Sequence, residues 1–232
     1  MTESLNRQRI STAVSNLGWR YVLGTVCASL RTGSPARGVE IAARLVEAAG
    51  EDAESVRLDV RGDRLVVTLQ APGTAEVTAR EVELAHRIAA TCADLGLRLD
   101  PGVNPGVEVA GERSVQMIEI AVDALDIARV RPFWKAVLGY VDEPGVSGPQ
   151  AALVDAVGQG PAVWFQQMDE PRPQRNRIHL DISVPHDEAD HRIRAALEAG
   201  GTLLSDTSAP AFWVLADSEG NEACVTTWQG RD

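Results

Sequence analysis

The chain has 232 residues with a formal net charge of −11, and 44% of its residues are hydrophobic. This length allows one large domain or two of ordinary size, each with a buried core. No run of about 20 apolar residues occurs, and the N-terminal stretch lacks an apolar signal core, so we expect neither a membrane span nor a secretory signal. Three scattered cysteines fit a reducing compartment, which predicts a cytoplasmic protein.

The acidic excess is confined to the second half of the chain. Residues 1–100 carry 12 basic and 13 acidic side chains, whereas residues 101–232 carry 10 basic and 20 acidic side chains. Phosphate contacts need a basic face, so this balance argues against nucleic acid as a partner.

The first hundred residues alternate helical and strand patterns. Ser34 can cap a helix whose first turn holds Pro35, and Thr78 can cap the last helix. The expected elements, in chain order, are a helix over 3–16, a strand over 21–30, a helix from 34, strands over 56–60 and 65–69 joined by a hairpin turn, and a helix from 78. The pattern predicts an α+β domain in which helices cover an antiparallel sheet.

Residues 101–113 interrupt every periodic pattern. Two Pro-Gly pairs and a further glycine between Asp100 and Arg113 are typical of a turn or linker. The charge balance also changes here. We therefore expect a first domain over 1–100, a linker over 101–113 and a second domain over 114–232.

The second domain contains an internal repeat with a constant offset of 62 positions over about 45 residues. Corresponding pairs are Ile120 and Ile182, Gly139 and Gly201, Asp155 and Asp217, and Gly158 and Gly220. Each copy predicts a strand, a helix and three short strands, with an Asp-x-x-Gly hairpin turn before the last strand. The sequence therefore predicts two βαβββ units.

Three stretches of the repeat carry a family resemblance: 133–139 (FWKAVLG), 176–181 (NRIHLD) and 217–224 (DSEGNEAC). They resemble the glyoxalase/bleomycin-resistance, or vicinal oxygen chelate, superfamily, and more narrowly its glyoxalase-like domains, over roughly residues 114–229. The resemblance implies that the two units form a U-shaped sheet around one small ligand, often with a divalent metal. An enzyme of this kind would have lyase, isomerase or dioxygenase-type activity.

The first domain resembles pterin-4a-carbinolamine dehydratase over roughly residues 5–97. The matching pieces are Gly18-Trp19, the helix at 36–49, and the stretches 59–69 and 77–85. That family has a His-His-Pro run before the first hairpin strand and a Thr-His pair after the second. An ungapped count from Leu69 places these positions on Glu54-Ser55-Val56 and Gln70-Ala71. Because all three histidines are absent, we expect the domain to lack dehydratase activity.

His179 is the candidate catalytic residue of the second domain. It lies in a predicted strand over 178–184, where alternation places His179 and Asp181 toward the cleft and Ile178 and Leu180 toward the core. The resemblance implies that the position of His179 is a metal ligand. A histidine that is only hydrogen-bonded to Asp181 is the alternative interpretation.

A complete metal site is harder to assemble from the sequence. The resemblance places the family's four ligand positions on Met117, Ala162, His179 and Cys224. A shifted register would bring in Gln166 instead of Ala162. Zinc needs three or four N, S or O ligands, so His179 and Cys224 require a further donor such as Gln166 or Glu119. We therefore do not expect a four-ligand metalloenzyme, and His179, Cys224 and Gln166 remain candidates for binding a divalent metal.

Other residues are candidates for binding an organic ligand. The loop over 170–177 joins the two units and includes Arg175 and Arg177. Arginine binds carboxylate or phosphate with two parallel hydrogen bonds, so the loop is either an anion clamp or a solvated connection. Trp164, on a predicted strand, could stack against the ligand. We expect the ligand to be a small organic molecule, and an anion is one option.

Two classes of function remain open at this point. The first is a glyoxalase-like binding protein or enzyme of unknown substrate, fused to a dehydratase-like domain without catalytic histidines. The second is a non-catalytic binding or regulatory module, including a pterin-binding protein without turnover. Either class allows a homodimer, and fold alone does not identify the substrate.

Overall fold

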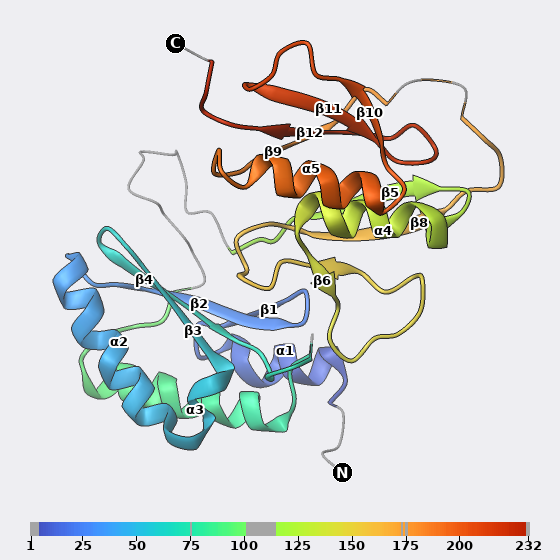
Figure 1. Cartoon of the computed structure of the whole chain (residues 1–232). Coiled ribbons are helices and arrows are strands. Elements are labelled where there is room, and N and C mark those ends of the chain that lie inside the picture. The colour runs from blue at the N-terminus through green and yellow to red at the C-terminus, as the bar shows by residue number, and fades with distance from the viewer. Residues whose placement is uncertain (1–4, 75, 101–114, 173, 175, 231–232) are drawn as a thin grey trace. The chain divides into compact units, whose positions relative to one another are not determined.

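The computed structural model describes residues 5–74, 76–100, 115–172, 174 and 176–230. The chain divides into two compact units, Met1–Met117 and Ile118–Asp232 (Figure 1). Residues 101–113, where the sequence predicts a linker, lie outside the described residues. Within the described part of the chain, no helix has both the length and the apolar character that a membrane crossing requires.

The first unit is an antiparallel sheet of four strands in the order β1-β2-β4-β3, with helices packed against it. Apolar side chains of the sheet and of all three α-helices build one core. The elements are α1 (Arg7–Ser15), β1 (Arg20–Val22), β2 (Thr25–Arg31), α2 (Pro35–Ala49), the 3-10 helix η1 (Gly50–Ser55), β3 (Val56–Arg61), β4 (Arg64–Leu69) and α3 (Ala79–Asp94).

The helix starts predicted at Ser34 and Thr78 are confirmed. The Ser34 side chain accepts a hydrogen bond from the Arg37 backbone N–H at 3.2 Å, and Pro35 begins α2. Thr78 and Glu81 form a capping box, in which the Glu81 carboxylate accepts from the Thr78 backbone N–H at 2.9 Å. These bonds satisfy donors that the first helical turn leaves without a partner.

The single strand predicted over 21–30 is wrong. The structure divides it into β1 and β2, which pair antiparallel through a two-residue turn at Leu23 and Gly24. Both turn residues have positive φ, 47° at Leu23 and 70° at Gly24. Such tight hairpins require this conformation, which glycine adopts readily and leucine rarely. An apolar residue at the first turn position hid the hairpin in the sequence.

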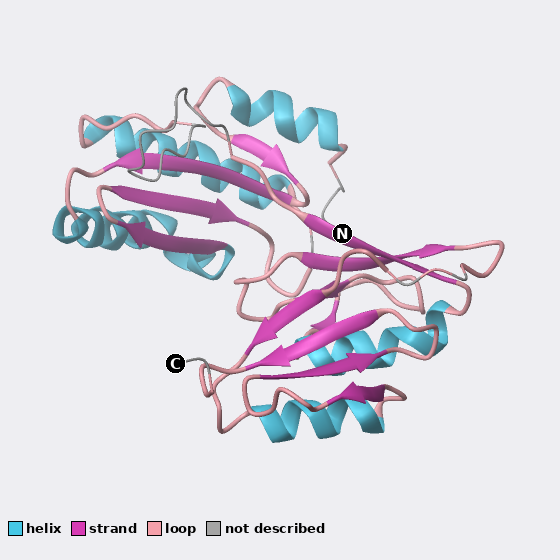
Figure 2. Cartoon of the chain, turned by 90° about the horizontal axis from the view of Figure 1, so that it is seen from above, coloured by secondary structure: helices cyan, strands magenta, loops and turns pink. Residues whose placement is uncertain are grey.

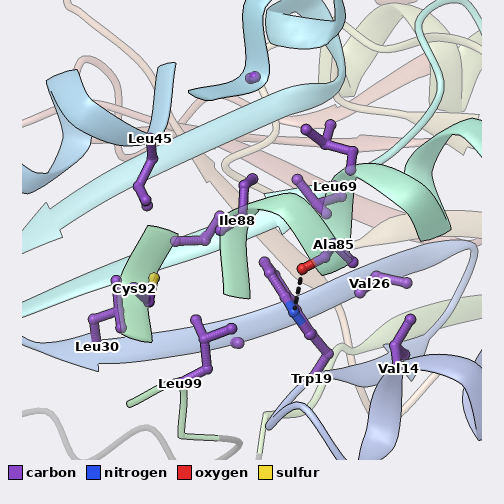
Figure 3. Packing of buried hydrophobic residues seen from close by; sticks show 14 of the residues in the cluster. Val14, Trp19, Val26, Leu30, Leu45, Leu69, Ala85, Ile88, Cys92 and Leu99 are labelled. Atoms are coloured by element: carbon purple, nitrogen blue, oxygen red, sulfur yellow. Dashed lines mark hydrogen bonds between the residues drawn. The ribbon is translucent and has the colours of Figure 1, made fainter. Parts of the chain in front are cut away.

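Trp19 anchors the core of the first unit. Its side chain is fully buried, and its indole N–H donates to the Ala85 carbonyl of α3 at 3.2 Å (Figure 3). Figure 3 shows Val14 of α1 and Val26 of β2 near the same ring. The tryptophan therefore ties the segment before β1 to the helix layer.

The pH dependence of the first unit should depend on Asp52 of η1. Hydrogen bonds from Arg87 and from Arg80 lower the pKa of the Asp52 carboxyl from its ordinary value of 3.8. A lowered pKa in the folded state adds stability above pH 3.8, and this stability is lost as the pH falls through the lowered value. We expect Asp52→Asn to destabilise the unit at pH 7, and the difference from wild type to shrink at pH 3.

Urea unfolding followed by NMR signals of the first unit, at both pH values, measures this difference. Asp59→Asn is the control, because the Asp59–Arg61 ion pair is exposed and exposed pairs contribute little. A difference between wild type and Asp52→Asn that is equal at the two pH values would contradict the prediction.

The second unit consists of two βαβββ repeats (Figure 2). Each repeat forms a four-stranded sheet, ordered β5-β8-β7-β6 in the first and β9-β12-β11-β10 in the second. The first repeat contains β5 (Glu119–Ala124), α4 (Ile127–Leu138), β6 (Val141–Asp142), β7 (Leu153–Val154) and β8 (Ala162–Gln167). The second contains β9 (Leu180–Ser183), α5 (Ala189–Glu198), β10 (Thr202–Ser205), β11 (Phe212–Ala216) and β12 (Glu222–Thr226).

The offset of 62 positions holds in the strand register. In both repeats the first and last strands pair in parallel, with Glu119 opposite Ala162 in one and Asp181 opposite Cys224 in the other. The two pairs occupy equivalent positions. The resemblance implies one U-shaped sheet, whereas the described strands form two, because the edge strands β5 and β9 are not paired with each other.

A buried carboxylate connects the two repeats. Asp217, in the turn before β12, is 3% exposed and accepts a hydrogen bond from the Trp134 indole of α4 at 3.0 Å. Nearby, the Glu219 carboxylate accepts from the backbone N–H groups of Leu125 and Asp126 at the start of α4. The hairpin of one repeat therefore holds the segment that leads into the helix of the other, while Asp126 itself caps α4 by accepting from the Arg129 backbone N–H at 3.1 Å.

Strand alternation predicted that Ile178 lies in the core, and this prediction is wrong. The Ile178 side chain is 80% exposed. Regular pairing begins only at Leu180, which lies opposite Ala223, so Ile178 precedes the strand. Leu180 and Ile182 do pack against the core as expected.

Candidate functional site

Three polar side chains converge on one face of the second sheet. His179 precedes β9, Asp181 lies in β9 and Cys224 lies in the neighbouring strand β12. His179 Nδ1 is 3.2 Å from Asp181 Oδ1 and 3.6 Å from Cys224 Sγ. One potential ligand atom from each of the three residues lies within 4.8 Å of the other two. The sequence named all three residues, and the structure brings them together.

Strand alternation explains why these side chains share a face. Ala223 and Val225 of β12 are fully buried on the helix side, which turns Cys224 to the opposite side. Asp181 lies directly opposite Cys224 in the parallel ladder. One step along the same face, Ser183 Oγ and Thr226 Oγ1 are 2.8 Å apart, so the polar row continues.

An open pocket of about 640 Å³ lies over this face. Its volume is in the range of sites that bind small molecules. It is lined by His179, Asp181, Ser208, Ala211, Phe212, Cys224, Thr226 and Gly230. Cys224 lies deep, at 6% exposure, whereas the side chains of His179 and Asp181 are 48% and 60% exposed. A ligand entering the pocket meets the imidazole and the carboxylate first.

One wall of the pocket is held by Thr227. Its side chain donates to the Pro210 carbonyl at 2.6 Å, and its backbone N–H donates to the Ala211 carbonyl at 2.9 Å. These bonds attach the loop before β11 to the end of β12. Sequence reasoning missed Ser208, Ala211, Phe212, Thr226 and Gly230. Alternation from Cys224 would have identified Thr226, but the loop has no local signal because its position depends on a distant threonine.

The other predicted binding residues do not line this pocket. Glu119 of β5, and Trp164 and Gln166 of β8, are exposed on the corresponding face of the first sheet. Arg177 is exposed and also does not line the pocket, while Arg175 lies outside the described residues. The anion clamp therefore stays a prediction.

The four-ligand metal set of the resembled family does not fit this chain. Ala162 offers only a methyl group, and Met117 belongs to the first unit, where its sulfur accepts from Thr25 Oγ1 at 3.9 Å. A site shared by both repeats would thus keep only His179 and Cys224. The structure adds Asp181, which the four-position pattern does not include.

Comparison with known proteins covers the second unit. Residues 119–226 match the family described as "Glyoxalase-like domain". The predicted glyoxalase-like domain is thus confirmed for residues 119–226. No curated protein matches the chain. The family match leaves the first unit uncovered, and its dehydratase resemblance stays a proposal.

Solved structures with similarity to the chain include a glyoxalase/bleomycin resistance protein/dioxygenase family enzyme from Burkholderia phytofirmans PsJN. It is 17% identical, with 47% of this chain and 95% of that chain covered and a TM-score of 0.39. Fosfomycin resistance protein FosX from Mesorhizobium loti is 11% identical, with 48% and 90% covered and a TM-score of 0.38.

Proposed function

We propose that the glyoxalase-like domain binds one small organic molecule in the pocket beside His179. The observation that carries the proposal is the convergence of His179, Asp181 and Cys224 on the face of a pocket of about 640 Å³. Phe212 offers an apolar surface, and Thr226 offers a hydroxyl group. A molecule with one apolar end and one hydrogen-bonding end fits this lining.

His179 is the candidate catalytic residue in this proposal. An imidazole can bind a ligand, transfer a proton or hold a metal ion near neutral pH. Turnover would be of the lyase, isomerase or dioxygenase type that the resemblance implies. The alternative is a non-catalytic binding or regulatory module, which would hold the same molecule unchanged.

Ligand-detected NMR with a library of small alcohols, ketones and carboxylates tests the binding proposal. Ser208 is exposed at the pocket, so the ring introduced by Ser208→Phe should obstruct it and prevent fragment binding without unfolding the domain. Ala121→Phe, at an exposed position on the first sheet, is the matched control and should bind normally. Equal binding by wild type and Ser208→Phe would place the ligand elsewhere. Chemical conversion of a fragment by wild type but not by His179→Ala would distinguish an enzyme from a binding protein.

The first unit should have no carbinolamine dehydratase activity. The two stretches that would hold the histidines do lie side by side, since the Gln70 N–H donates to the Ser55 carbonyl at 3.0 Å. Ser55 is buried and donates to Glu81, and all four histidines of the chain lie elsewhere. Losing acid/base groups costs about 10²–10⁴-fold per group. The rate should therefore approach the uncatalysed background.

The assay follows the disappearance of chemically generated carbinolamine with the full chain. Glu54→Ala tests whether the remaining carboxylate supports any residual rate. Pterin binding is measured separately by equilibrium dialysis, because a pocket can keep its ligand after losing turnover. A rate comparable to that of a histidine-bearing dehydratase would contradict the proposed alignment.

A further inference from the structure

We propose that His179, Asp181 and Cys224 form a zinc site contained within the second repeat. The inference rests on the proposed function, because the ion would lie in the wall of the pocket that the organic molecule occupies. It differs from the four-position set of the resembled family in two respects. Asp181 supplies a ligand, and the first repeat supplies none.

Two of the three distances between the donor atoms match those of ligands on one small cation, and the third pair, Asp181 and Cys224, lies within 4.8 Å. Zinc binds thiolate at about 2.3 Å, imidazole at about 2.0–2.1 Å and carboxylate at about 2.0–2.2 Å in tetrahedral geometry, so bound donor atoms lie roughly 3–4 Å apart. Nδ1 of His179 is already 3.2 Å from Asp181 Oδ1 and 3.6 Å from Cys224 Sγ. An ion could be bound with small movements of the side chains alone.

Two of the three ligands, Asp181 and Cys224, are paired residues of adjacent strands, and His179 directly precedes the first of these strands. The equivalent pair of the first repeat is Glu119 and Ala162. That pair has one carboxylate and a methyl group where the second repeat has a carboxylate and a thiol. The comparison within one chain therefore assigns the ion to the second repeat.

The donor set selects the metal. A thiolate is a soft ligand that favours zinc, whereas Mg²⁺, Ca²⁺ and Mn²⁺ prefer oxygen ligands in larger number. Three protein ligands leave a fourth zinc position open, as in zinc sites that bind water or substrate. Here the three residues line the pocket, so this position would be accessible to the ligand.

The other two cysteines lie away from this set. Cys92 is in the core of the first unit, where burial raises the pKa of its thiol to about 11, so it keeps its proton. Cys27 is buried in β2, with its sulfur near Thr25 and Thr68. Neither cysteine belongs to the proposed site, so neither should contribute a thiolate-to-metal band.

Titration of the chelator-treated full chain with Co²⁺ tests the proposal. We expect one equivalent to bind, with the intense visible bands of tetrahedral cobalt and a near-ultraviolet thiolate-to-cobalt band. Zn²⁺ should displace the cobalt, and Mg²⁺ and Mn²⁺ at the same concentration should not. Absence of binding, displacement by Mg²⁺ or Mn²⁺, or a spectrum without the thiolate band would overturn the proposal.

Variants identify the ligands. Cys224→Ser should abolish the thiolate band, and His179→Ala and Asp181→Asn should each weaken Co²⁺ binding by about 100-fold or more, since even the loss of a ligand's hydrogen-bond partner costs about 10–100-fold. Glu119→Gln is the control for Asp181→Asn at the equivalent position of the first repeat, and Cys27→Ser is the control for the thiol. Neither should change binding. A thiolate band that persists in Cys224→Ser would sink the assignment.

The metal and fragment assays separate the two proposals. Fragment binding that Ser208→Phe abolishes, in a protein that does not bind Co²⁺, would reject the zinc site and leave the proposed function intact. Cobalt binding with the expected spectrum, in a protein that binds no fragment, would support the zinc site and reject the binding proposal. Far-ultraviolet circular dichroism confirms that each variant is folded.

Discussion

Replacing Asp217 with alanine should destabilise the glyoxalase-like domain by about 3 kcal/mol, because it leaves the buried Trp134 indole N–H without a partner, and a buried donor left unsatisfied costs about 1–3 kcal/mol. The carboxylate accepts from the Trp134 indole at 3.0 Å and from the backbone N–H groups of Glu219 and Asn221, each at 2.9 Å. The Asn221 side chain donates to it as well, at 2.7 Å. Only 3% of Asp217 is exposed, so water cannot easily replace these bonds.

The first repeat contains a natural control for this prediction. Asp155, at the equivalent position, accepts from backbone N–H groups of its own turn, among them Val157, Gln159 and Gly160, and among the described residues none of its hydrogen-bond partners lies in the other repeat. Because Asp155 is only half-buried, water can replace these bonds, and Asp155→Ala should cost less, about 1 kcal/mol. Urea unfolding of both variants measures the difference. Equal effects would show that the bond to Trp134 does not stabilise the contact between the repeats, and a double-mutant cycle with Trp134→Phe isolates that bond.

Trp19→Ala should destabilise the first unit by about 3–5 kcal/mol, the range found when a large buried aromatic side chain is removed from a core. The ring is fully buried among residues of α1, β2 and α3, and its N–H satisfies the Ala85 carbonyl. The cavity left behind and the lost hydrogen bond act in the same direction.

NMR signals of the first unit, followed through urea unfolding, measure the effect of Trp19→Ala. Leu23→Ala, at a partly exposed turn position, is the control and should change the free energy of unfolding by less than about 0.5 kcal/mol. Trp19→Phe should have an intermediate effect, because it keeps one aromatic ring in the core and loses the second ring together with the N–H donor. A loss below about 1 kcal/mol for Trp19→Ala would mean that the core around Ala85 repacks.

Much of the fold was predictable because local patterns and tertiary packing agree. The caps at Ser34 and Thr78 depend only on neighbouring backbone groups, so their residue types were sufficient evidence. The repeat was visible because equivalent positions carry similar residues. The hairpin at Leu23 was not visible, since a leucine with positive φ is maintained by the pairing on both sides rather than by its own preference.

The candidate site was only partly predictable, for a similar reason. Alternation predicted that His179 and Asp181 share a face, and the family resemblance pointed to Cys224, which lies on the neighbouring strand. The wall formed by Ser208 and Ala211 depends on hydrogen bonds from Thr227, which is 17 residues from Pro210. Such a contact leaves no periodic trace, so only the folded chain shows that this loop borders the pocket.

The identical register of the two parallel strand pairs has a consequence for stoichiometry. Glu119 and Ala162 occupy the same backbone positions as Asp181 and Cys224. The two sheets therefore have the same strand pairing, but only the second has a thiol at this pair. Under the proposed function, only the second sheet carries the set of His179, Asp181 and Cys224 that binds the ligand. Binding isotherms should therefore saturate at one equivalent per chain, although the architecture provides two platforms. Ala162→Cys would place a thiol beside the Glu119 carboxylate in the first sheet, as Cys224 lies beside Asp181 in the second.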